Sequence, residues 1–510
     1  MPKKSIIILT IAVYVLFIFI VGLVSHKKSK SITDFTVAGR NAGAWLSAFS
    51  YGTAYFSAVM FIGYAGSTGW KYGIWGVLPG IGNAIFGSLL AWLVLAKRTR
   101  AVTKEHKIKS MPQLFEKCFG SKKMKNFCVA VIFIFLVPYS ASVYKGLTSV
   151  CSVILGVPEN VCMIIIAVAA AVIVVLGGYA ATLKADFIQG FVMLAGVILL
   201  IFSVLRCNQV GGVREGLFAI SEKTKELNLS VFDHIGLWAT VLMTSFGTWG
   251  LPQMIHKYYG IRDDKEVKRG TVISTIFAFV VAGGGYFIGS LSRLFYSDLS
   301  QLPGAGSGKT DYLIPNMLNI AGLSDILVGV ILVLLIAASV STLSSITITA
   351  STTLSMDFII PKFFKNKDSA WAAKLTKFVC FAFVLVSYFI ANSDTPILDM
   401  MSYSWGVISG AFLAPYLLSL YWKKINTTGA WAGMITGFVI ALPPMICRLF
   451  SIPATLGSFG KIMDLGPHFA CVSAVLSCLA CVVVSLSVKS KENGFVKAKN
   501  ITKAVSNETV

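Results

Sequence analysis

A chain of 510 residues that is 56% hydrophobic and only 13% charged, with a mean hydropathy of +0.77, is too apolar for a water-soluble enzyme. The composition therefore indicates a polytopic membrane protein. The formal net charge of +22 does not indicate a nucleic-acid partner, because the basic residues lie in short loops between apolar runs, as membrane topology requires.

Thirteen apolar runs are long enough to cross a bilayer, whose core of ~30 Å needs about 20 helical residues. The runs are 6–24, 44–64, 74–95, 127–147, 161–176, 187–205, 235–255, 271–295, 326–351, 375–391, 402–421, 431–449 and 469–488. Most of the 44 lysines and arginines fall in alternate connections, so the positive-inside rule places the N-terminus outside and the C-terminus in the cytoplasm. We therefore expect an all-α, multi-pass protein of the cell membrane with 13 transmembrane helices.

The second and seventh runs contain helix interruptions. The second carries Gly52 and Gly63, and the seventh reads FGTWGLPQM, with Gly247, Gly250 and Pro252. Interruptions free backbone carbonyls, which a membrane interior tolerates only where a cavity, an ion or another helix satisfies them. Packing glycines and a proline kink are the alternative for either run alone.

The two interrupted runs open successive groups of five helices. This pairing predicts a 5+5 inverted repeat (helices 2–6 and 7–11) with one preceding and two following helices, and a site at the bilayer midplane. The expected segments are 1–43 (first helix and the cytoplasmic loop after it), 44–205 (first repeat), 206–421 (second repeat), 422–488 (helices 12 and 13) and 489–510 (cytoplasmic tail).

An uncharged run, 326–356, carries ten hydroxyls between Ser339 and Thr353. Helical spacing puts Ala338, Ser341, Thr342 and Ser345 on one face. Neutral oxygens on a buried face suit a small hard cation, because they replace its water shell without burying a full charge. Alternatively, small polar residues only let helices approach closely.

Asp186 is the informative charge inside the apolar runs. Burying a carboxylate there costs roughly 2.5–3.5 kcal/mol on insertion scales unless a cation compensates it. That cation could be Lys184, two residues away, or a bound monovalent ion.

From Thr36 to Gly437 the chain resembles the bacterial sodium:solute symporters, which have the LeuT-type inverted repeat. The resemblance rests on five blocks in order: AGRNAGAWLSAFSYGTAYFS (38–57), LGGYAATLKAD (176–186), GLPQMIHKYY (250–259), AASVSTLSS (337–345) and SYSWGVISGAFLAPYLLSLYWKKINTTGAWAGMITG (402–437).

The resemblance implies a first sodium site. It consists of backbone carbonyls in the broken second helix and a carbonyl and two hydroxyls in the ninth, which here fall on Thr53, Phe56, Ala338, Ser341 and Thr342.

The resemblance also implies a second sodium site, present in some members of the family, on Asp186, Ser341, Ser344 and Ser345. Two sodium ions would then be coupled, and replacing Asp186 with Asn should lower the Hill coefficient for sodium toward one. Arg40 matches an arginine at the cytoplasmic end of the second helix.

The solute pocket departs from that of proline carriers in the family. They have Asp where this chain has Tyr55, and Trp at the positions of Val59 and Thr244, which makes proline a doubtful substrate. The expected pocket wall is Ser57, Tyr139, Trp249, Gln253, Tyr403 and Trp405. Aromatic faces with few polar groups suit a small amino acid, a carboxylate or a vitamin-like solute better than a sugar, although plain packing also explains each aromatic.

The expected function is sodium-coupled import of a small organic solute by alternating access, with sodium as the coupling ion, no cofactor and no other metal. The partners are the solute, sodium ions and the lipid bilayer. A sodium-coupled sugar symporter, a passive solute channel and a membrane sensor are the alternatives. A sensor would need an output domain, and only about 22 residues follow Val488. An enzyme is not expected, because the five histidines show neither a paired nucleophile nor metal-ligand spacing.

Overall fold

The computed structural model describes residues 3–26, 40–303, 308–393, 395–450, 462 and 464–488, so the expected tail 489–510 lies outside the described residues. Within these ranges the chain is helical, and the one β-type pairing is an isolated bridge between Ala42 and Ile261. Nine of the described helical segments are long and apolar enough to cross a membrane. Part of the difference from thirteen arises at the interrupted helices, because their first halves, Ala44–Tyr55 and Val231–Phe246, have 12 and 16 residues and are too short to span alone.

The first half of the chain consists of α-helices interspersed with short π- and 3-10-helical segments, which are labelled η. They are α1 (Lys3–His26), α3 (Ala44–Tyr55), η2 (Val59–Tyr64), α4 (Ala65–Tyr72), η3 (Gly73–Val77), α5 (Leu78–Gly82), η4 (Asn83–Leu90), η5 (Trp92–Ala96), α6 (Lys97–Glu105), α7 (Met111–Phe119), α8 (Lys122–Leu155), α9 (Glu159–Leu205) and α10 (Val213–Glu226).

The second half continues the bundle. Its elements are α11 (Val231–Phe246), η6 (Gly247–Gly250), α12 (Pro252–Tyr259), α13 (Asp264–Ala278), η7 (Phe279–Gly283), α14 (Gly284–Leu291), η8 (Ser292–Leu294), η9 (Leu299–Gln301), η11 (Thr310–Tyr312), α15 (Leu313–Ile320), α16 (Asp325–Leu354), η12 (Ser355–Ile359), α17 (Ile360–Phe363), α18 (Ser369–Ala391), α19 (Ile397–Tyr421), α20 (Thr427–Ala441), α21 (Pro443–Leu449) and α22 (Gly466–Ser487).

The fifth and sixth apolar runs, predicted as two helices, form one continuous helix in the structure. This helix is α9, and the predicted connection 177–186 is helical too. Its two glycines cost about 1 kcal/mol each but break no helix, and it contains no proline. Asp186 therefore lies inside a helix and is fully buried.

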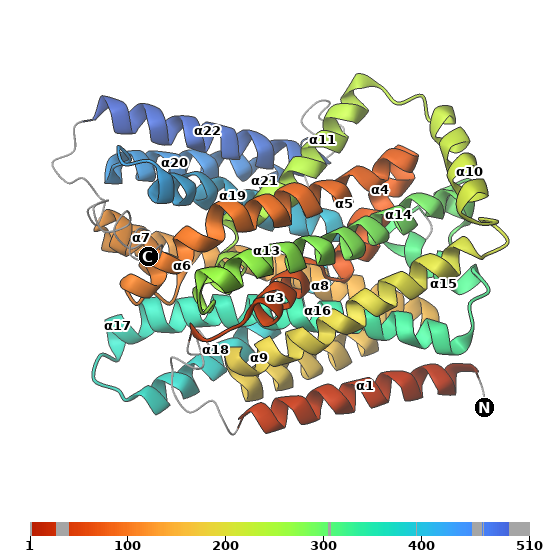
Figure 1. The fold of residues 1–510 in the computed structure, drawn as a ribbon, viewed down its shortest axis with the longest axis horizontal. Coiled ribbons are helices and arrows are strands. Elements are labelled where there is room, and N and C mark those ends of the chain that lie inside the picture. The colour runs from red at the N-terminus through yellow and green to blue at the C-terminus, as the bar shows by residue number, and fades with distance from the viewer. Residues whose placement is uncertain are drawn as a thin grey trace.

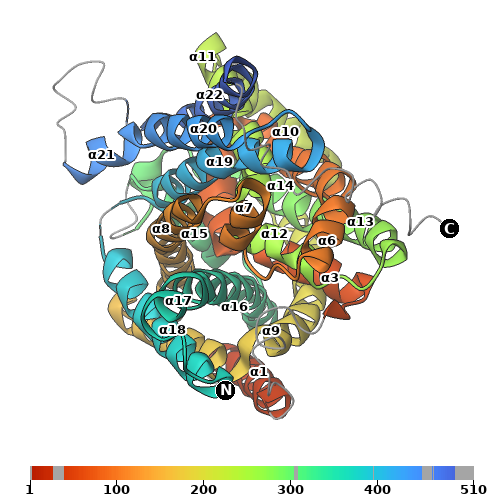
Figure 2. The same cartoon turned by 90° about the vertical axis from the view of Figure 1, so that its left-hand side faces the viewer.

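The packing of the helices is reciprocal between the two halves. The hydroxyl-rich α16 lies in the middle of the bundle, with α1 along one edge and α20 and α22 along the opposite edge (Figures 1 and 2). The third helix of the first half, α8, packs on α19, and its counterpart α16 packs on α9. Two equivalent repeats would produce this exchange.

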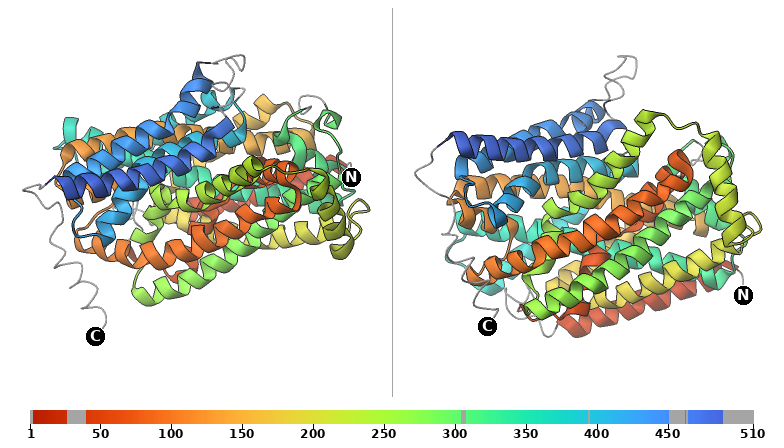
Figure 3. Two further views of the ribbon diagram at one scale, coloured as in Figure 1. Left: turned by 90° about the horizontal axis from the view of Figure 1, so that it is seen from above. Right: turned by 45° about the horizontal axis from the view of Figure 1, so that its top comes forward.

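The helices α20 and α22 pack on each other and on α19 as an added layer (Figure 3).

Helices α4 and α14 approach to backbone contact at Gly289, and we expect Gly289→Ala to destabilise the fold. A Cβ there would lie 2.1 Å from the carbonyl oxygen of Ala65, which cannot move without shifting α4. Thermal unfolding in detergent should show a loss of about 1–3 kcal/mol. The control is Gly283→Ala in the same span, where a Cβ meets nothing within 4 Å and helix propensity should improve. Equal stability of the two variants would contradict the close approach.

Candidate functional site

The first interruption follows Tyr55. Phe56 has extended backbone angles (φ −105°, ψ 109°), so α3 ends there. The Met60 amide, which would bond the Phe56 carbonyl in a continuous helix, donates to the Ser57 carbonyl at 3.0 Å. The helical hydrogen-bond ladder is therefore broken at the point where the sequence predicts ion ligands.

The second interruption follows α11. A single 3-10 turn, η6, leads to Leu251, which is extended (φ −79°, ψ 122°), and the chain becomes helical again at Pro252. Proline is well suited to this first helical position because the missing N–H needs no partner there. Both predicted interruptions are confirmed, and both are buried.

Helix α16 presents its hydroxyls to the first interruption. The Thr342 hydroxyl donates to the Thr53 carbonyl at 3.1 Å and lies 3.0 Å from the Ala338 carbonyl. The Ser341 hydroxyl lies 2.8 Å from that of Thr53. Four of the five residues predicted for the first sodium site are thus in direct contact, and the fifth, Phe56, lies on the interruption itself.

This cluster fits an alkali cation by its donor set. Thr53, Phe56, Ala338, Ser341 and Thr342 are at most 1% exposed, and the oxygens that meet there are neutral carbonyls and hydroxyls. A sodium ion would replace contacts that these oxygens now make with one another. Neutral oxygens in a water-free place favour a cation with a single charge.

Asp186 lies beside this cluster. Its Oδ1 is 2.6 Å from the Ser341 hydroxyl, and its Oδ2 accepts from Ser50 at 2.5 Å. Lys184, which the sequence offered as a compensating cation, is exposed, so that alternative is wrong. The cation is Lys257 of α12, whose Nζ is 3.3 Å from Asp186 Oδ2.

Sequence reasoning missed Lys257. The side chain is 3% exposed, and besides Asp186 it donates to the Ser50 hydroxyl at 2.8 Å and the Ser345 hydroxyl at 2.9 Å. Two of the four residues predicted for a second sodium site, Asp186 and Ser345, therefore contact an ammonium group, and a third, Ser341, contacts the other oxygen of Asp186. The fourth, Ser344, has a buried hydroxyl without a hydrogen-bond partner among the described residues.

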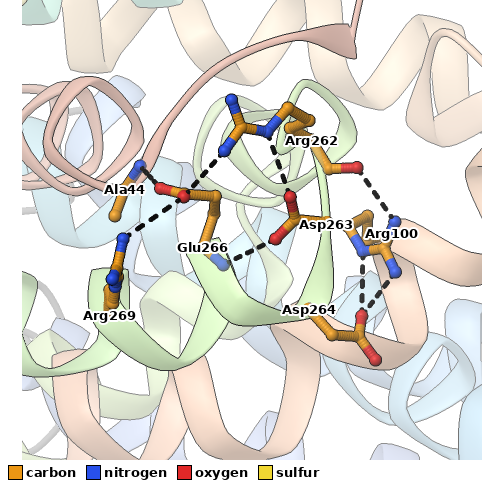
Figure 4. A network of polar contacts seen from close by, with 7 residues as sticks. All are labelled: Ala44, Arg100, Arg262, Asp263, Asp264, Glu266 and Arg269. Atoms are coloured by element: carbon orange, nitrogen blue, oxygen red, sulfur yellow. Dashed lines mark hydrogen bonds and ion pairs between the residues drawn. The ribbon is translucent and has the colours of Figure 1, made fainter. Parts of the chain in front are cut away.

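The start of α3 is held by a carboxylate from another helix (Figure 4). Glu266 Oε2 accepts the Ala44 amide at 2.6 Å, and its other oxygen is 2.9 Å from Arg262 and 3.8 Å from Arg269. A negative charge at a helix N-terminus satisfies a free amide and complements the helix dipole. Glu266 thus caps the half-helix that carries Thr53.

Neighbouring contacts tie this end of the bundle together. Arg100 pairs with Asp264, with Nε at 3.1 Å from Oδ1, and Asp263 accepts the Glu266 amide at 2.9 Å (Figure 4). That hydrogen bond lowers the pKa of the Asp263 carboxyl. Arg40, predicted at this end of α3, donates to the carbonyls of Tyr259 at 3.2 Å and Ile108 at 2.6 Å.

We expect Glu266→Ala to weaken sodium binding about threefold to tenfold, because loss of an N-terminal cap costs roughly 1 kcal/mol and frees α3. Glu266→Gln keeps an acceptor for Ala44 and should have a smaller effect. Sodium titration of intrinsic fluorescence measures both variants. If Glu266→Ala binds sodium like the unmodified protein, the cap does not support the site.

The residues predicted for the solute pocket fall into two sets. The rings of Tyr139 and Trp405 are in edge contact, 5.6 Å between centroids, and the Tyr139 hydroxyl, the Trp405 Nε1 and the Gln253 amide are buried without hydrogen-bond partners among the described residues. Such orphaned groups are costly unless a ligand meets them.

The remaining predicted pocket residues have other neighbours. Trp249 donates to the Phe86 carbonyl at 3.0 Å, and Ser57 accepts from the Val59 amide at 3.2 Å. Tyr403 lies next to Gly466, at the start of α22. Trp249 and Ser57 therefore form their hydrogen bonds with residues other than the Tyr139–Trp405 pair.

Two positions where this chain departs from proline carriers touch each other. The Tyr55 hydroxyl donates to the Thr244 carbonyl at 2.6 Å. The third, Val59, is fully buried. The Tyr55–Thr244 hydrogen bond therefore links the two interrupted helices.

Comparison with known proteins gives consistent matches. Residues 35–437 match the model of the Sodium:solute symporter family. The chain is 25% identical to the osmoregulated proline transporter OpuE of Bacillus subtilis, over 95% of each chain, and 24% identical to the sodium/pantothenate symporter of Escherichia coli, over 94% of this chain and 95% of the other. In fold it is similar to an outward-open, substrate-bound Na+-coupled sialic acid symporter, with a TM-score of 0.77, 17% identity and coverage of 95% and 98%.

Proposed function

Because this chain belongs to the sodium:solute symporter family, we propose that it couples the inward movement of sodium to the import of a small organic solute. The observation that carries the proposal is the contact of Thr342 and Ser341 with Thr53, at the interruption of α3. Oxygens from a rigid helix and from an interrupted one meet there, so a bound ion would join two parts of the molecule that move relative to each other.

The first sodium ion is held by the carbonyls of Thr53, Phe56 and Ala338 and the hydroxyls of Ser341 and Thr342. Binding orders the interrupted helix, the solute binds beside it, and the two repeats rock to open the site inward. One sodium crossing ~100 mV releases about 2.3 kcal/mol, and a tenfold gradient adds about 1.4 kcal/mol. One ion can therefore support a solute gradient of roughly 500-fold.

The proposed topology has 13 crossings, with the N-terminus outside and the C-terminus in the cytoplasm. Its support is the charge distribution together with the parallel course of α1 and α22 in Figure 1, since the first and last helices run parallel when the number of crossings is odd. The contacts of Glu266 with Ala44 and Arg262 then lie at the cytoplasmic end.

The proposed solute is a small amino acid, a carboxylate or a vitamin-like molecule. Three buried polar groups, on Tyr139, Gln253 and Trp405, are enough to orient such a solute but too few for the hydroxyls of a sugar. Curated relatives carry proline or pantothenate. The joint change at Tyr55 and Thr244 favours a solute other than proline.

The test is a thermal-shift screen of the purified protein against amino acids, short carboxylates and vitamins, in sodium and in choline buffer. A true solute stabilises by mass action, and only when sodium is present. The solute found is then supplied to proteoliposomes, where uptake should stop when the sodium gradient is collapsed. Uptake that continues down the solute's own gradient at an unchanged rate would instead support a passive channel.

A further inference from the structure

The ammonium group of Lys257 lies where a second cation would be expected. It is held by oxygens from three other helices: Ser50 of α3, Asp186 of α9 and Ser345 of α16. We propose that this tethered cation takes the place of a second sodium ion, so that the chain couples one sodium to each solute. The proposal rests on the function proposed above.

The geometry of the contacts supports the assignment. An ammonium group has three N–H donors, and the three oxygens lie 2.8, 3.3 and 2.9 Å from Nζ. Two of these oxygens, on Asp186 and Ser345, belong to the set predicted for the second sodium ion. A sodium ion that used both would have to displace the lysine from its contacts with Asp186 and Ser345.

The charges around Asp186 lead to the same conclusion. Asp186 and Lys257 are 0% and 3% exposed, so a carboxylate and an ammonium are buried together as a neutral pair. A sodium ion added here would place two positive charges against one carboxylate, away from water, where repulsion is weakly screened. The residues present therefore do not fit a second sodium ion while Lys257 is in place.

Repulsion between Lys257 and a sodium ion at the first site is reduced, because the Asp186 carboxylate lies between them. The carboxylate lies between the two places: Oδ1 is 2.6 Å from Ser341, whereas Oδ2 faces Lys257. Lys257 thus also fixes the carboxylate that orients the Ser341 hydroxyl. It is a positioning residue for the first site and a substitute for the ion at the second.

The test is equilibrium binding of radioactive sodium to the full-length protein in lipid nanodiscs, which gives the number of ions per chain without transport. We expect one ion and a Hill coefficient of one. Lys257→Ala should vacate the place beside Asp186 and raise the number of bound ions to two, whereas Lys257→Ala with Asp186→Asn should return it to one. Lys145→Ala is the matched control, because Lys145 also lies in a membrane helix but donates to the carbonyls of Ser393 and Thr395.

The outcomes separate this inference from the proposed function. Two ions bound to the unmodified protein would overturn the role of Lys257 and leave sodium coupling intact. No bound sodium at all would overturn the proposed function instead. The measurement on the unmodified protein decides the matter even if Lys257→Ala does not fold. A Lys257→Ala variant that folds and still binds one ion would also overturn the inference.

Discussion

Replacing Thr342 with alanine is expected to weaken sodium binding by roughly 10- to 100-fold. The substitution removes a hydroxyl that lies 3.1 Å from the Thr53 carbonyl and would contact the ion directly. A hydrogen bond or ligand contact to a charged group contributes about 1.5–3 kcal/mol, and each 1.4 kcal/mol is tenfold in affinity. The sodium concentration that gives half-maximal solute uptake should rise accordingly, as should the dissociation constant from sodium-dependent thermal shifts.

Thr352→Ala is the matched control for this change. Thr352 lies on the same helix and its hydroxyl also bonds back to a carbonyl, that of Ile348 at 2.5 Å, but it does not take part in the contact with α3. Its replacement should leave sodium affinity within about twofold, since surface-side changes usually cost under ~0.5 kcal/mol. If Thr342→Ala and Thr352→Ala titrate alike, sodium does not bind at the interruption of α3.

The local signals for this site are strong in the sequence. Glycines and a proline inside apolar runs predicted both interruptions, and the spacing of Ala338, Ser341, Thr342 and Ser345 predicted a hydroxyl face on one helix. The structure confirms these features because each depends on a few neighbouring residues and on helix periodicity. The packing of α8 on α19 and of α16 on α9 is the exchange that the predicted inverted repeat would produce.

Lys257 could not be found in this way. The seventh apolar run ends at Ile255, so the lysine falls among the charges of the following loop when hydropathy alone is used. In the structure α12 begins at Pro252 and continues to Tyr259, which carries Lys257 into the bundle. Two signals in the sequence could have indicated this. A proline after an interruption can begin a new helix. The two tyrosines that follow Lys257 are apolar enough to be buried, as they are in the structure.

Hydropathy also failed to predict that the fifth and sixth apolar runs form one helix, α9. Periodicity and hydropathy detect where a run is apolar, but a helix can continue through GGYAATLKAD, where neither property indicates it. Which cation faces Asp186 depends on a contact between residues 71 positions apart, and no local pattern encodes that distance. Long-range pairing of charges therefore had to come from the structure.

Asp186→Asn is expected to lower the free energy of unfolding by about 3–5 kcal/mol, because it removes the negative charge that lies 3.3 Å from the buried ammonium of Lys257. The sequence alone predicts a different result, a Hill coefficient for sodium that falls toward one. With Lys257 beside the carboxylate, we expect the Hill coefficient to be one already, so the loss should appear in stability. Thermal and denaturant unfolding in detergent measure it.

The double variant Asp186→Asn with Lys257→Met separates the ion pair from its two members. Removing both charges together should recover most of the lost stability, since replacing a whole buried pair is often nearly neutral whereas breaking it is not. Glu222→Gln is the control: it breaks the exposed pair of Glu222 with Lys225 and should cost under ~0.5 kcal/mol. If the losses in free energy of unfolding add in the double variant, Asp186 and Lys257 are not coupled. Such a result would contradict the proposal that Lys257 acts as the cation at this site.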